Sequence, residues 1–392
     1  MNRHLHEISP APASDRLFFS YLLKNGPSSR AEIAAKHDLS RPTASEAALR
    51  LSERKYIKTL EKDAGASGKR GRVPELYDIA DDIGSVLTVV VNVLGVTVSL
   101  YDLRGNLLEQ KYEDHVWETH AKSYEAVEKL LDSVIALAHG PFLAATAAVM
   151  TSVNPITQQL IALPDSPYTE EPVDFFGLLS HKLNCPVLVD ETINWALLHE
   201  ITHGVARNSP ATFGVHLAEG VQGAFALGNT IYRGASGRAG AMGYIQSHHK
   251  QLNQALKELG VPDRTNSEIY GVTYLDYEKT AEKILANVDG KEEKEYLDLS
   301  VEAIVNGALI LDPASVVLTG PMTCSRKFIE VLQSAIEEKM LWDSTEVLIS
   351  DDGADAISLG TACGANLLAL TYMGLEDPSV LGRDHVPPER LA

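Results

Sequence analysis

Three closely spaced helix boundaries near the beginning of the chain constrain its fold more than any other feature of the sequence. An amphipathic segment at 15–25 ends at Gly26-Pro27, a pair that stops a helix. Ser29 then begins a second helix, and Glu32, three residues on, completes a capping box. Ser40 begins a third helix, where the proline that follows is tolerated in the first turn. Three short helices in this order indicate a helix-turn-helix unit.

The apolar residues of these segments predict how the helices pack. We expect the second helix to bury Ile33 with Ala34 behind it. In the third helix, which should end near Arg54, Leu49 is the expected main core anchor. Small side chains that let neighbouring elements approach closely are Ala44, Ala47 and Ala48. The shared face of the first helix is expected to consist of Leu17, Phe18, Tyr21 and Leu22.

The third helix of such a unit enters the major groove of DNA, and its first residues meet the base edges. Arginine pairs bidentately with guanine, serine and threonine contact either base type, and glutamate accepts a hydrogen bond from cytosine. The predicted DNA-binding residues of this helix are Ser40, Arg41, Thr43, Ser45, Glu46 and Arg50. An ordinary three-helix bundle with a solvated charged face is the alternative interpretation of the same pattern.

A predicted wing follows the three helices. Tyr56–Leu60 and Leu76–Ile79 have the composition of two short strands, and the Gly-rich loop GASGKRGRVP lies between them. Glycines allow close approach to a nucleic-acid backbone, and basic side chains suit phosphates or a narrow minor groove. The loop residues expected to bind DNA are Lys69, Arg70 and Arg72. A flexible linker is the alternative for the loop alone.

The charge distribution supports a polyanionic partner for the amino-terminal end. Residues 1–80 hold 14 basic and 10 acidic residues, whereas the whole chain holds 34 and 53, for a net charge of −19. A reversal of sign confined to one end marks that end as the part that meets DNA. The sequence has no apolar run long enough for a membrane span and no signal-peptide pattern in its first 16 residues, which are expected to form a flexible arm. The three cysteines, Cys185, Cys324 and Cys363, fit buried thiols in a reducing cytoplasm.

The rest of the chain alternates apolar strands with amphipathic helices, which predicts an α/β body. A strand is expected from Val86, turning at Arg104-Gly105 into a second strand. A helix at Tyr124–Ala138 should bury Val127, Leu131, Val134 and Ile135. Further strands are expected at Phe142–Met150 and from Pro186.

The LSRPTAS and GKRGRVPELY stretches together resemble the winged helix-turn-helix of the ROK family (repressor, open reading frame, kinase). The resemblance continues through CPVLVDETINWALLHE and FGVHLAEGVQGAFALGNTIYRGASGRAGAMGY to GADAISLGTACGANLLAL. It implies a two-lobed, actin-like ATPase fold behind the winged module. The expected domains are a winged helix-turn-helix at 1–80, a small α/β lobe at 81–203 completed by a helix at 355–375, a large lobe at 204–354, and a flexible tail at 376–392.

The positions that carry sugar-kinase chemistry in the family are altered here. The family's catalytic base is the Asp of an Asn-Asp-x-Asn motif, and the resemblance places Glu191, Thr192, Ile193 and Asn194 at that motif. A threonine hydroxyl at the base position cannot accept a proton from a sugar near pH 7. Asp190 or Glu191 would substitute for it only if the backbone shifted.

The nucleotide turns are altered as well. The first strand hairpin carries Asn92, Val93 and Leu94 instead of a Gly-rich phosphate turn. The second turn keeps Gly220 and Gly223, but Glu219 would repel a triphosphate. ATP binding is therefore not expected, and these glycines are interpreted as an ordinary strand turn.

The family motif Gly-x-x-Gly-Glu-x-Gly-His binds sugar through its Glu and His, and its His also binds zinc. Here Ala241 and Tyr244 replace these two residues between preserved glycines. The family's zinc cysteines are absent from the region of Ser247, His248 and His249, which continues into a predicted helix, LNQALKEL. We therefore expect no metal and no cofactor.

His199-Glu200-Ile201-Thr202-His203 matches the zinc-protease pattern HExxH, but no downstream third ligand is recognisable. The segment coincides with the ROK helix that follows the Asn-Asp-x-Asn position. We interpret it as part of that helix.

These observations predict a cytoplasmic, non-enzymatic transcriptional regulator, a repressor of sugar or carbohydrate metabolism genes. Its expected partners are a double-stranded DNA operator and a second copy of itself in a homodimer or dimer of dimers. Three outcomes stay open for a small-molecule effector: an altered sugar or sugar phosphate, a different effector, or none. The candidate effector-binding residues are Asn154, Glu191, Thr192, Asn194, Arg238 and Tyr244. Two alternatives stay open: a ROK sugar kinase with weak ATP-dependent activity, and a scaffold that does not bind DNA.

Overall fold

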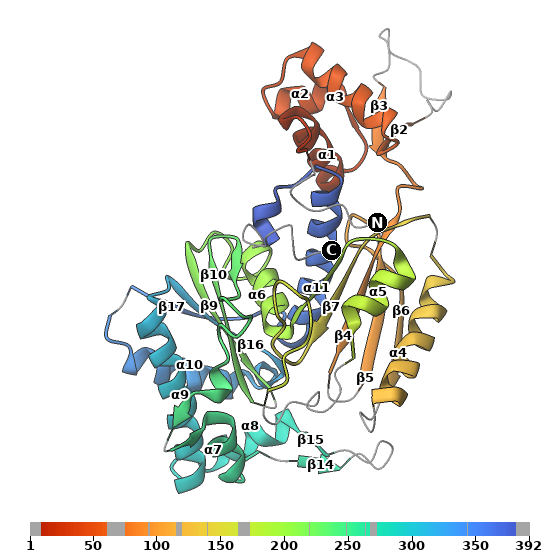
Figure 1. The fold of residues 1–392 in the computed structure, drawn as a ribbon. Helices are drawn as coiled ribbons and strands as arrows, with labels where there is room; N and C mark the ends of the chain where they lie inside the picture. Colours follow the sequence, from red (N-terminus) through yellow and green to blue (C-terminus); the bar gives the residue numbers. More distant parts are fainter. Residues whose placement is uncertain are drawn as a thin grey trace.

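The chain begins with a small unit of three helices and three short strands, which stands at one end of a two-lobed body (Figure 1). In this computed structural model the described residues are 9–60, 75–92, 95–114, 120–138, 140–163, 173–218, 220–247, 249–262, 264–266, 273–342 and 344–381. The elements of the small unit, called the amino-terminal module below, are α1 (Ala13–Asn25), β1 (Ser28–Ser29), α2 (Arg30–Lys36), α3 (Arg41–Glu53), β2 (Ile57–Thr59) and β3 (Leu76–Ile79).

The helix boundaries of the module lie where the sequence predicts them. Gly26 ends α1 with a positive φ of 75°. The Ser29 side chain accepts a hydrogen bond from the Glu32 amide, and the Glu32 side chain completes the capping box. The Ser40 hydroxyl caps α3 by accepting from the Thr43 amide. The two predicted wing strands pair antiparallel, and β1 adds a third strand on the other edge of β3. The basic loop with Lys69, Arg70 and Arg72 lies outside the described residues.

Two predicted core positions of the module are wrong. Leu49 is 60% exposed, and Leu51 is fully buried in its place. Leu51 follows the buried Ala47 and Ala48 at helical spacings of four and three, so it continues their face while Leu49 points away. In α1, Leu17 is 37% exposed and Phe19 is buried instead. The predicted Phe18 and Leu22 are both buried.

The first lobe of the body contains a five-stranded sheet in the order β6-β5-β4-β7-β8. Strands β4, β5 and β6 pair antiparallel, β7 pairs with β4 in parallel, and β8 pairs with β7 in parallel. Helices α4 (His120–Ile135) and α5 (Phe175–Leu183) cover one face, and α6 (Thr192–Thr202) and α11 (Ala356–Tyr372) cover the other. The strands are β4 (Ser85–Val91), β5 (Gly95–Tyr101), β6 (Leu107–Asp114), β7 (Phe142–Val149) and β8 (Val187–Glu191).

The expected single strand running from Val86 to the turn at Arg104-Gly105 is wrong. The chain breaks at Asn92, whose side-chain oxygen accepts a hydrogen bond from the Gly95 amide. β4 and β5 therefore form a first hairpin, and Arg104-Gly105 forms the turn of a second hairpin between β5 and β6. Periodicity does not reveal this break, because both strands are buried on both faces and their residues do not alternate between apolar and polar.

The second lobe repeats the topology of the first. Its sheet has the order β11-β10-β9-β16-β17, again with three antiparallel strands followed by two parallel ones. This repetition of one mixed sheet is the predicted two-lobed, actin-like α/β fold. The strands are β9 (Ala211–Leu217), β10 (Val221–Leu227), β11 (Thr230–Tyr232), β16 (Ser315–Thr319) and β17 (Glu346–Ile349). The helices are α7 (Leu252–Glu258), α8 (Tyr277–Ala286), α9 (Lys291–Leu311) and α10 (Arg326–Lys339).

The remaining elements are short. They are the 3-10 helices η2 (Met242–Tyr244), η3 (Pro321–Cys324), η4 (Gly353–Asp355) and η5 (Pro378–Leu381), and the strands β12 (Gln246–Ser247), β13 (Lys250–Gln251), β14 (Arg264–Asn266) and β15 (Thr273–Leu275). Among the described helices, none is both long and apolar enough to cross a membrane.

Helices α6 and α11 pack closely because α11 carries glycines where they meet. A Cβ atom on Gly360 would lie 1.8 Å from the Trp195 carbonyl oxygen, and one on Gly364 would lie 2.0 Å from the Trp195 ring. The Trp195 indole in turn donates a hydrogen bond to the Ala147 carbonyl of β7. The carboxyl-terminal helix is therefore tied to the sheet of the first lobe.

The described residues next to each chain end pack against the protein, whereas residues 1–8 of the expected arm and 382–392 of the expected tail lie outside the described residues. Ala11 is buried, and its amide donates to the Gly374 carbonyl at 2.8 Å, so the expected flexible arm is wrong for the residues just before α1. The expected loose tail is wrong at η5, where Leu381 is buried. Cys324 is exposed, which corrects the expectation that all three cysteines are buried.

Candidate nucleic-acid interface and inter-lobe site

The outward side of α3 carries most of the residues predicted to contact DNA. Ser40, Arg41 and Glu46 are exposed, and Thr43 and Ser45 are half-buried. The Ser40 and Thr43 hydroxyls lie 2.7 Å apart and bond to each other as part of the cap. The helix therefore presents charged and hydroxyl groups along its first two turns, the part that enters a groove in helix-turn-helix proteins.

Arg50 is the exception. Its Nε and Nη2 donate to the carboxylate of Asp15 on α1, at 2.9 and 2.5 Å. The Asp15 side chain is 1% exposed, and Nη2 of Arg50 also donates to the Ser14 hydroxyl at 3.1 Å. The hydrogen bond to Asp15 is the main reason that the pKa of Arg50 is raised. The structure thus places Arg50 in the α1–α3 contact, where it holds the helix, while its Nη1 lies 3.7 Å from the exposed Glu46. Its contact with DNA stays a prediction.

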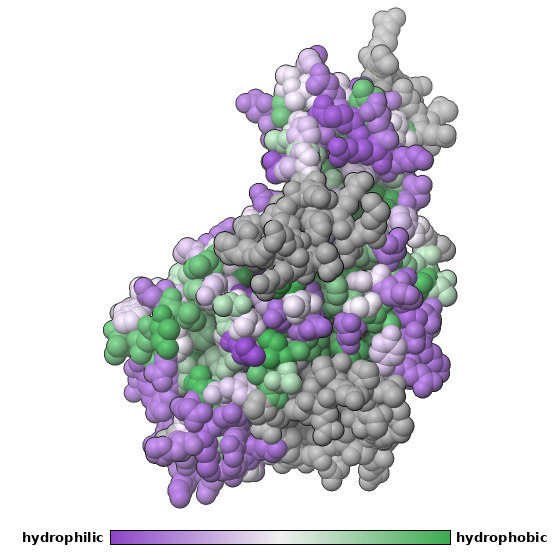
Figure 2. Space-filling view, viewed as in Figure 1, coloured by the Kyte–Doolittle hydropathy of each residue, from purple (hydrophilic) through white to green (hydrophobic). Residues whose placement is uncertain are grey.

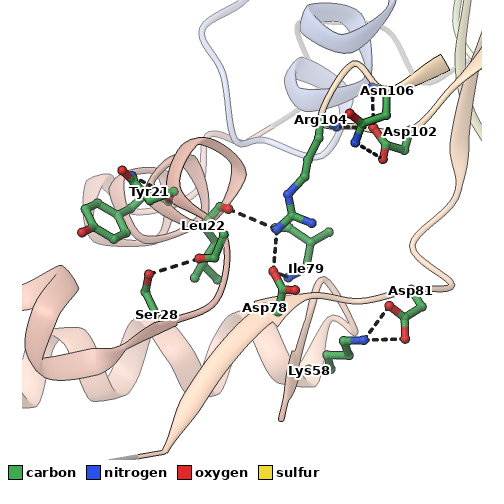
Figure 3. A network of polar contacts seen from close by, with 12 residues as sticks. Tyr21, Leu22, Ser28, Lys58, Asp78, Ile79, Asp81, Asp102, Arg104 and Asn106 are labelled. Atoms are coloured by element: carbon green, nitrogen blue, oxygen red, sulfur yellow. Dashed lines mark hydrogen bonds and ion pairs between the residues drawn. The ribbon is translucent and has the colours of Figure 1, made fainter.

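A second polar network joins the module to the body (Figure 3). Arg104, at the tip of the β5–β6 hairpin, donates from Nη2 to the Leu22 carbonyl at 3.2 Å and to Oδ1 of Asp78 on β3 at 2.5 Å. Asp102 shapes the hairpin turn by accepting from the amides of Arg104 and Asn106. One continuous hydrophobic cluster also runs from α1 and α3 to α6 and α11. The module is therefore docked on the body by both polar and apolar contacts.

The candidate effector residues near the start of α6 lie around a buried ion pair between the lobes. Oδ2 of Asp190, at the end of β8, accepts from Nε of Arg233, just after β11, at 2.6 Å. Both side chains are less than a tenth exposed. Asn194 donates to the other Asp190 oxygen at 2.7 Å, and Arg233 also donates to the Leu381 carbonyl at 2.9 Å. The Asp190–Arg233 pair thereby connects the two lobes, and Arg233 connects them to the carboxyl-terminal segment.

Glu191 and Thr192 occupy the positions where a base would act. The pKa of Glu191 is raised to about 8, mainly by burial and also by the neighbouring Asp190, while a hydrogen bond from Ser152 at 3.2 Å opposes the shift. Glu191 is thus largely protonated at pH 7. The Thr192 hydroxyl is buried and lies 3.5 Å from the side-chain oxygen of Gln222 in the second lobe. Neither side chain provides a carboxylate base near neutral pH.

The other candidate effector residues are more scattered. The Asn154 side chain accepts from the amides of Ile156 and Thr157 and so stabilises its own turn. That turn abuts the Gly-rich loop of the second lobe, because a Cβ atom on Gly237 would lie 1.9 Å from the Val153 carbonyl oxygen. Arg238 is exposed and donates to Ser236, and Tyr244 is half-buried in η2. The structure brings Glu191, Thr192 and Asn194 together and leaves Arg238 at the surface.

The second nucleotide turn is filled by a protein side chain. Asn253 of α7 accepts from the Val221 amide at 2.9 Å and lies against both Gly220 and Gly243. The adjoining pocket, lined by Leu217, Val221 and Met322 among others, has a volume of about 10 Å³, which is about the space of one water molecule.

The HExxH segment has other bonding partners. Nε2 of His199 lies 2.6 Å from Asp352, and its ring stacks on that of His203. Glu200 bonds to the Ser350 hydroxyl and the Val205 amide. Across the described part of the chain, no three His, Cys, Asp or Glu side chains are arranged to hold a metal ion.

Sequence reasoning missed the residues that act through distant partners, namely Asp15, Arg104, Arg233 and Asn253. Each pairs with a residue or element far away in the chain. No local pattern in the sequence marks them.

Comparisons with known proteins agree with this architecture. Solved structures that share the fold include a ROK family transcriptional regulator, homologue of the E. coli MLC protein, with a TM-score of 0.67 and 14% identity over 92% of this chain and 98% of that one. A ROK family glucokinase from Streptomyces griseus has a TM-score of 0.56 and 16% identity over 72% of this chain and 99% of that one. The two-lobed body is thus a sugar-kinase-like fold.

Sequence comparisons find similarity to the same family. Residues 93–257 match the model of the ROK family, and the chain carries a ROK family domain. A xylose repressor from Bacillus subtilis is 22% identical over 238 residues, which are 59% of this chain and 60% of that protein. A xylose repressor from Caldicellulosiruptor bescii is 24% identical over 233 residues, 58% of this chain and 57% of that protein. The chain thus matches about three fifths of the length of these relatives.

Proposed function

We propose that the chain is a sequence-specific DNA-binding transcriptional regulator that represses genes of sugar or carbohydrate metabolism. The observation that carries this proposal is the outward presentation of Arg41, Ser45 and Glu46 on α3, while the Arg50–Asp15 pair holds that helix in place. The likeness to xylose repressors supports both the regulatory role and the sugar-related genes. We also propose that the chain is divided into a winged helix-turn-helix at 1–80 and the two lobes that follow it.

The body is proposed to have no sugar-kinase activity. Thr192 stands at the base position, Glu191 is largely protonated at pH 7, and Asp190 is held by Arg233. Asn253 occupies the turn where a nucleotide phosphate would bind. These four features support a body that arranges and regulates the DNA-binding modules.

We expect the active species to be a homodimer or a dimer of dimers. One winged module covers one half-site, so tight operator binding requires at least two modules. A sugar or sugar-phosphate bound between the lobes would regulate the protein if it bound one arrangement of the modules better than another. The residues proposed for this contact remain Asn154, Glu191, Thr192, Asn194, Arg238 and Tyr244.

The DNA-binding proposal is tested by selecting duplexes from a random pool with the full chain, then measuring affinity by gel shift at fixed salt. We expect one recurring, two-fold related sequence, and we expect Arg41→Ala to abolish its specific shift. The matched control is Arg207→Ala, which removes an exposed arginine of the body. Recovery of no sequence preference would refute the proposal.

The kinase alternative is tested by a coupled assay for ADP release over a panel of pentoses, hexoses and acetylated amino sugars. We expect no turnover from the wild-type chain. Sugar-dependent turnover that is lost in Glu191→Gln or Asp190→Asn would establish the kinase in place of our proposal. The same sugars, added to the gel shift, identify an effector as the one that changes operator affinity.

A further inference from the structure

Leu49 is an exposed leucine in the middle of the helix proposed to enter the major groove. Its exposure of 60% contrasts with the complete burial of Leu51, two residues on. Ser45, Glu46 and Leu49 are spaced by three and four residues, so they lie on one face of α3. The Leu49 side chain therefore lies on the outward face of α3 with Ser45 and Glu46, called the outward stripe below, and contributes nothing to the core.

The neighbours of Leu49 argue against a protein partner on this face. The stripe is polar before it, at Ser45 and Glu46, and charged after it, at Glu53 and Arg54, all of which are exposed or half-buried. The visible face of the module is mostly hydrophilic, with small separate apolar areas (Figure 2). A stable protein interface needs about 800 Å² from each partner with an apolar centre. One leucine between charged side chains does not provide that.

The major groove of DNA offers apolar groups of the matching size. Each thymine presents a single C5-methyl group among hydrogen-bonding atoms, and apolar side chains read this group. With a helical rise of 1.5 Å per residue, Leu49 lies about 6 Å further along α3 than Ser45. Since base pairs are spaced by about 3.4 Å, this separation corresponds to about two base pairs when the helix follows the groove.

We propose that Leu49 is a specificity-determining residue that contacts the C5-methyl group of a thymine in the operator, about two base pairs from the base contacted by Ser45. The inference rests on the proposed DNA-binding function. It also accounts for a leucine that the fold leaves in water. Arg50, the neighbouring long side chain, is held through Nε and Nη2 by Asp15 on α1, and its Nη1 lies 3.7 Å from Glu46.

The test uses the full chain and the duplexes selected from a random pool, in which each thymine is replaced by uracil in turn. This replacement removes the methyl group and leaves the base pairing intact. Loss of one buried methyl contact should weaken wild-type binding about fourfold at one position of each half-site. Leu49→Ala should bind the thymine duplex about as weakly as the wild type binds the uracil duplex. Its affinity should no longer change when uracil replaces thymine at that position.

The matched control is Leu341→Ala, which shortens an exposed leucine of the body. It should keep wild-type affinity and wild-type sensitivity to uracil. If no uracil replacement weakens the wild type, or if Leu49→Ala shows the same loss as the wild type at every thymine, the proposal is overturned while DNA binding itself stands. If the wild-type chain selects no sequence at all, both proposals fail together.

Discussion

Replacing Arg50 with methionine should destabilise the amino-terminal module even in the absence of DNA. The substitution keeps a long apolar stem but removes the guanidinium that donates to both carboxylate oxygens of Asp15, at 2.9 and 2.5 Å. The Asp15 side chain is 1% exposed, so water does not replace the lost donors. Within the described contacts, only the Ser14 hydroxyl still donates to this carboxylate.

The magnitude follows from the burial of the two partners. Removing one partner of a buried ion pair destabilises a protein by about 3–5 kcal/mol, because the other charge stays buried and unpaired. The Arg50 side chain is 34% exposed, so solvent already screens part of the attraction. We therefore expect a loss of about 2–3 kcal/mol, which lies in the range measured for hydrogen bonds to charged groups.

Hydrogen exchange followed by mass spectrometry is the suitable assay, because it reports on α1 and α3 separately from the body. In Arg50→Met, the amides of both helices should exchange about 30- to 150-fold faster at 25 °C, which is the same free energy expressed as a ratio. Arg41→Met is the matched control, since Arg41 lies exposed on the same helix and should leave exchange nearly unchanged. Adding Asp15→Asn to Arg50→Met should recover part of the loss. Unchanged exchange in Arg50→Met combined with lost DNA binding would refute the structural role and return Arg50 to the DNA surface.

Three further predictions concern the body. The pKa of Glu191 is raised, mainly by burial, from 4.5 in the unfolded chain to about 8 in the folded chain. The contribution of the protonated side chain to stability is therefore complete below pH 4.5 and is lost as pH rises through 8. Between pH 6 and 7.5 the unfolding free energy of the wild type, measured by urea unfolding, should fall relative to that of Glu191→Gln by about 1.4 kcal/mol per pH unit. A difference between the two proteins that does not change with pH would contradict the raised pKa of Glu191. Gly364→Ala would place a Cβ atom 2.0 Å from the Trp195 ring, so it should lower the free energy of unfolding in urea by about 1–3 kcal/mol. An unchanged urea midpoint would exclude this effect. Arg104→Met should speed hydrogen exchange in β3 and the last turn of α1 while leaving α4 unchanged, because it removes the bonds to Asp78 and the Leu22 carbonyl; equal exchange in β3 would show that the apolar contacts alone dock the module.

The helix boundaries of the module were predictable because their causes are local. A serine cap and its glutamate three residues on need no information from the rest of the chain, and Gly26 ends α1 by its own backbone freedom. The choice between Leu49 and Leu51 depends on which face of α3 packs against α1. Both are leucines on the same helix, and only the packing of α1 and the alanine face decides which one is buried. The apolar run from Val86 likewise does not mark the hairpin at Asn92 by its periodicity, because a strand buried on both faces shows no alternation, and only the family resemblance placed a hairpin there.

For the inter-lobe site, the resemblance identified which family residues are replaced but gave no indication of what replaces their interactions. Thr192, Ala241 and Tyr244 can be located by aligning motifs, whereas the Asp190–Arg233 pair joins residues 43 positions apart and extends to the Leu381 carbonyl. This pair limits how an effector can act. Separating a buried ion pair costs about 3–5 kcal/mol, more than the 1–3 kcal/mol of a typical coupling between two sites. An effector with ordinary coupling energy would therefore have to move Asp190 and Arg233 together, with the lobes rotating about this contact. Helix α6 begins beside this ion pair and packs through Trp195 against α11. Just after α11, the Gly374 carbonyl accepts a hydrogen bond from the Ala11 amide, which precedes α1. A rotation of the lobes therefore has a continuous packed route to the amino-terminal module.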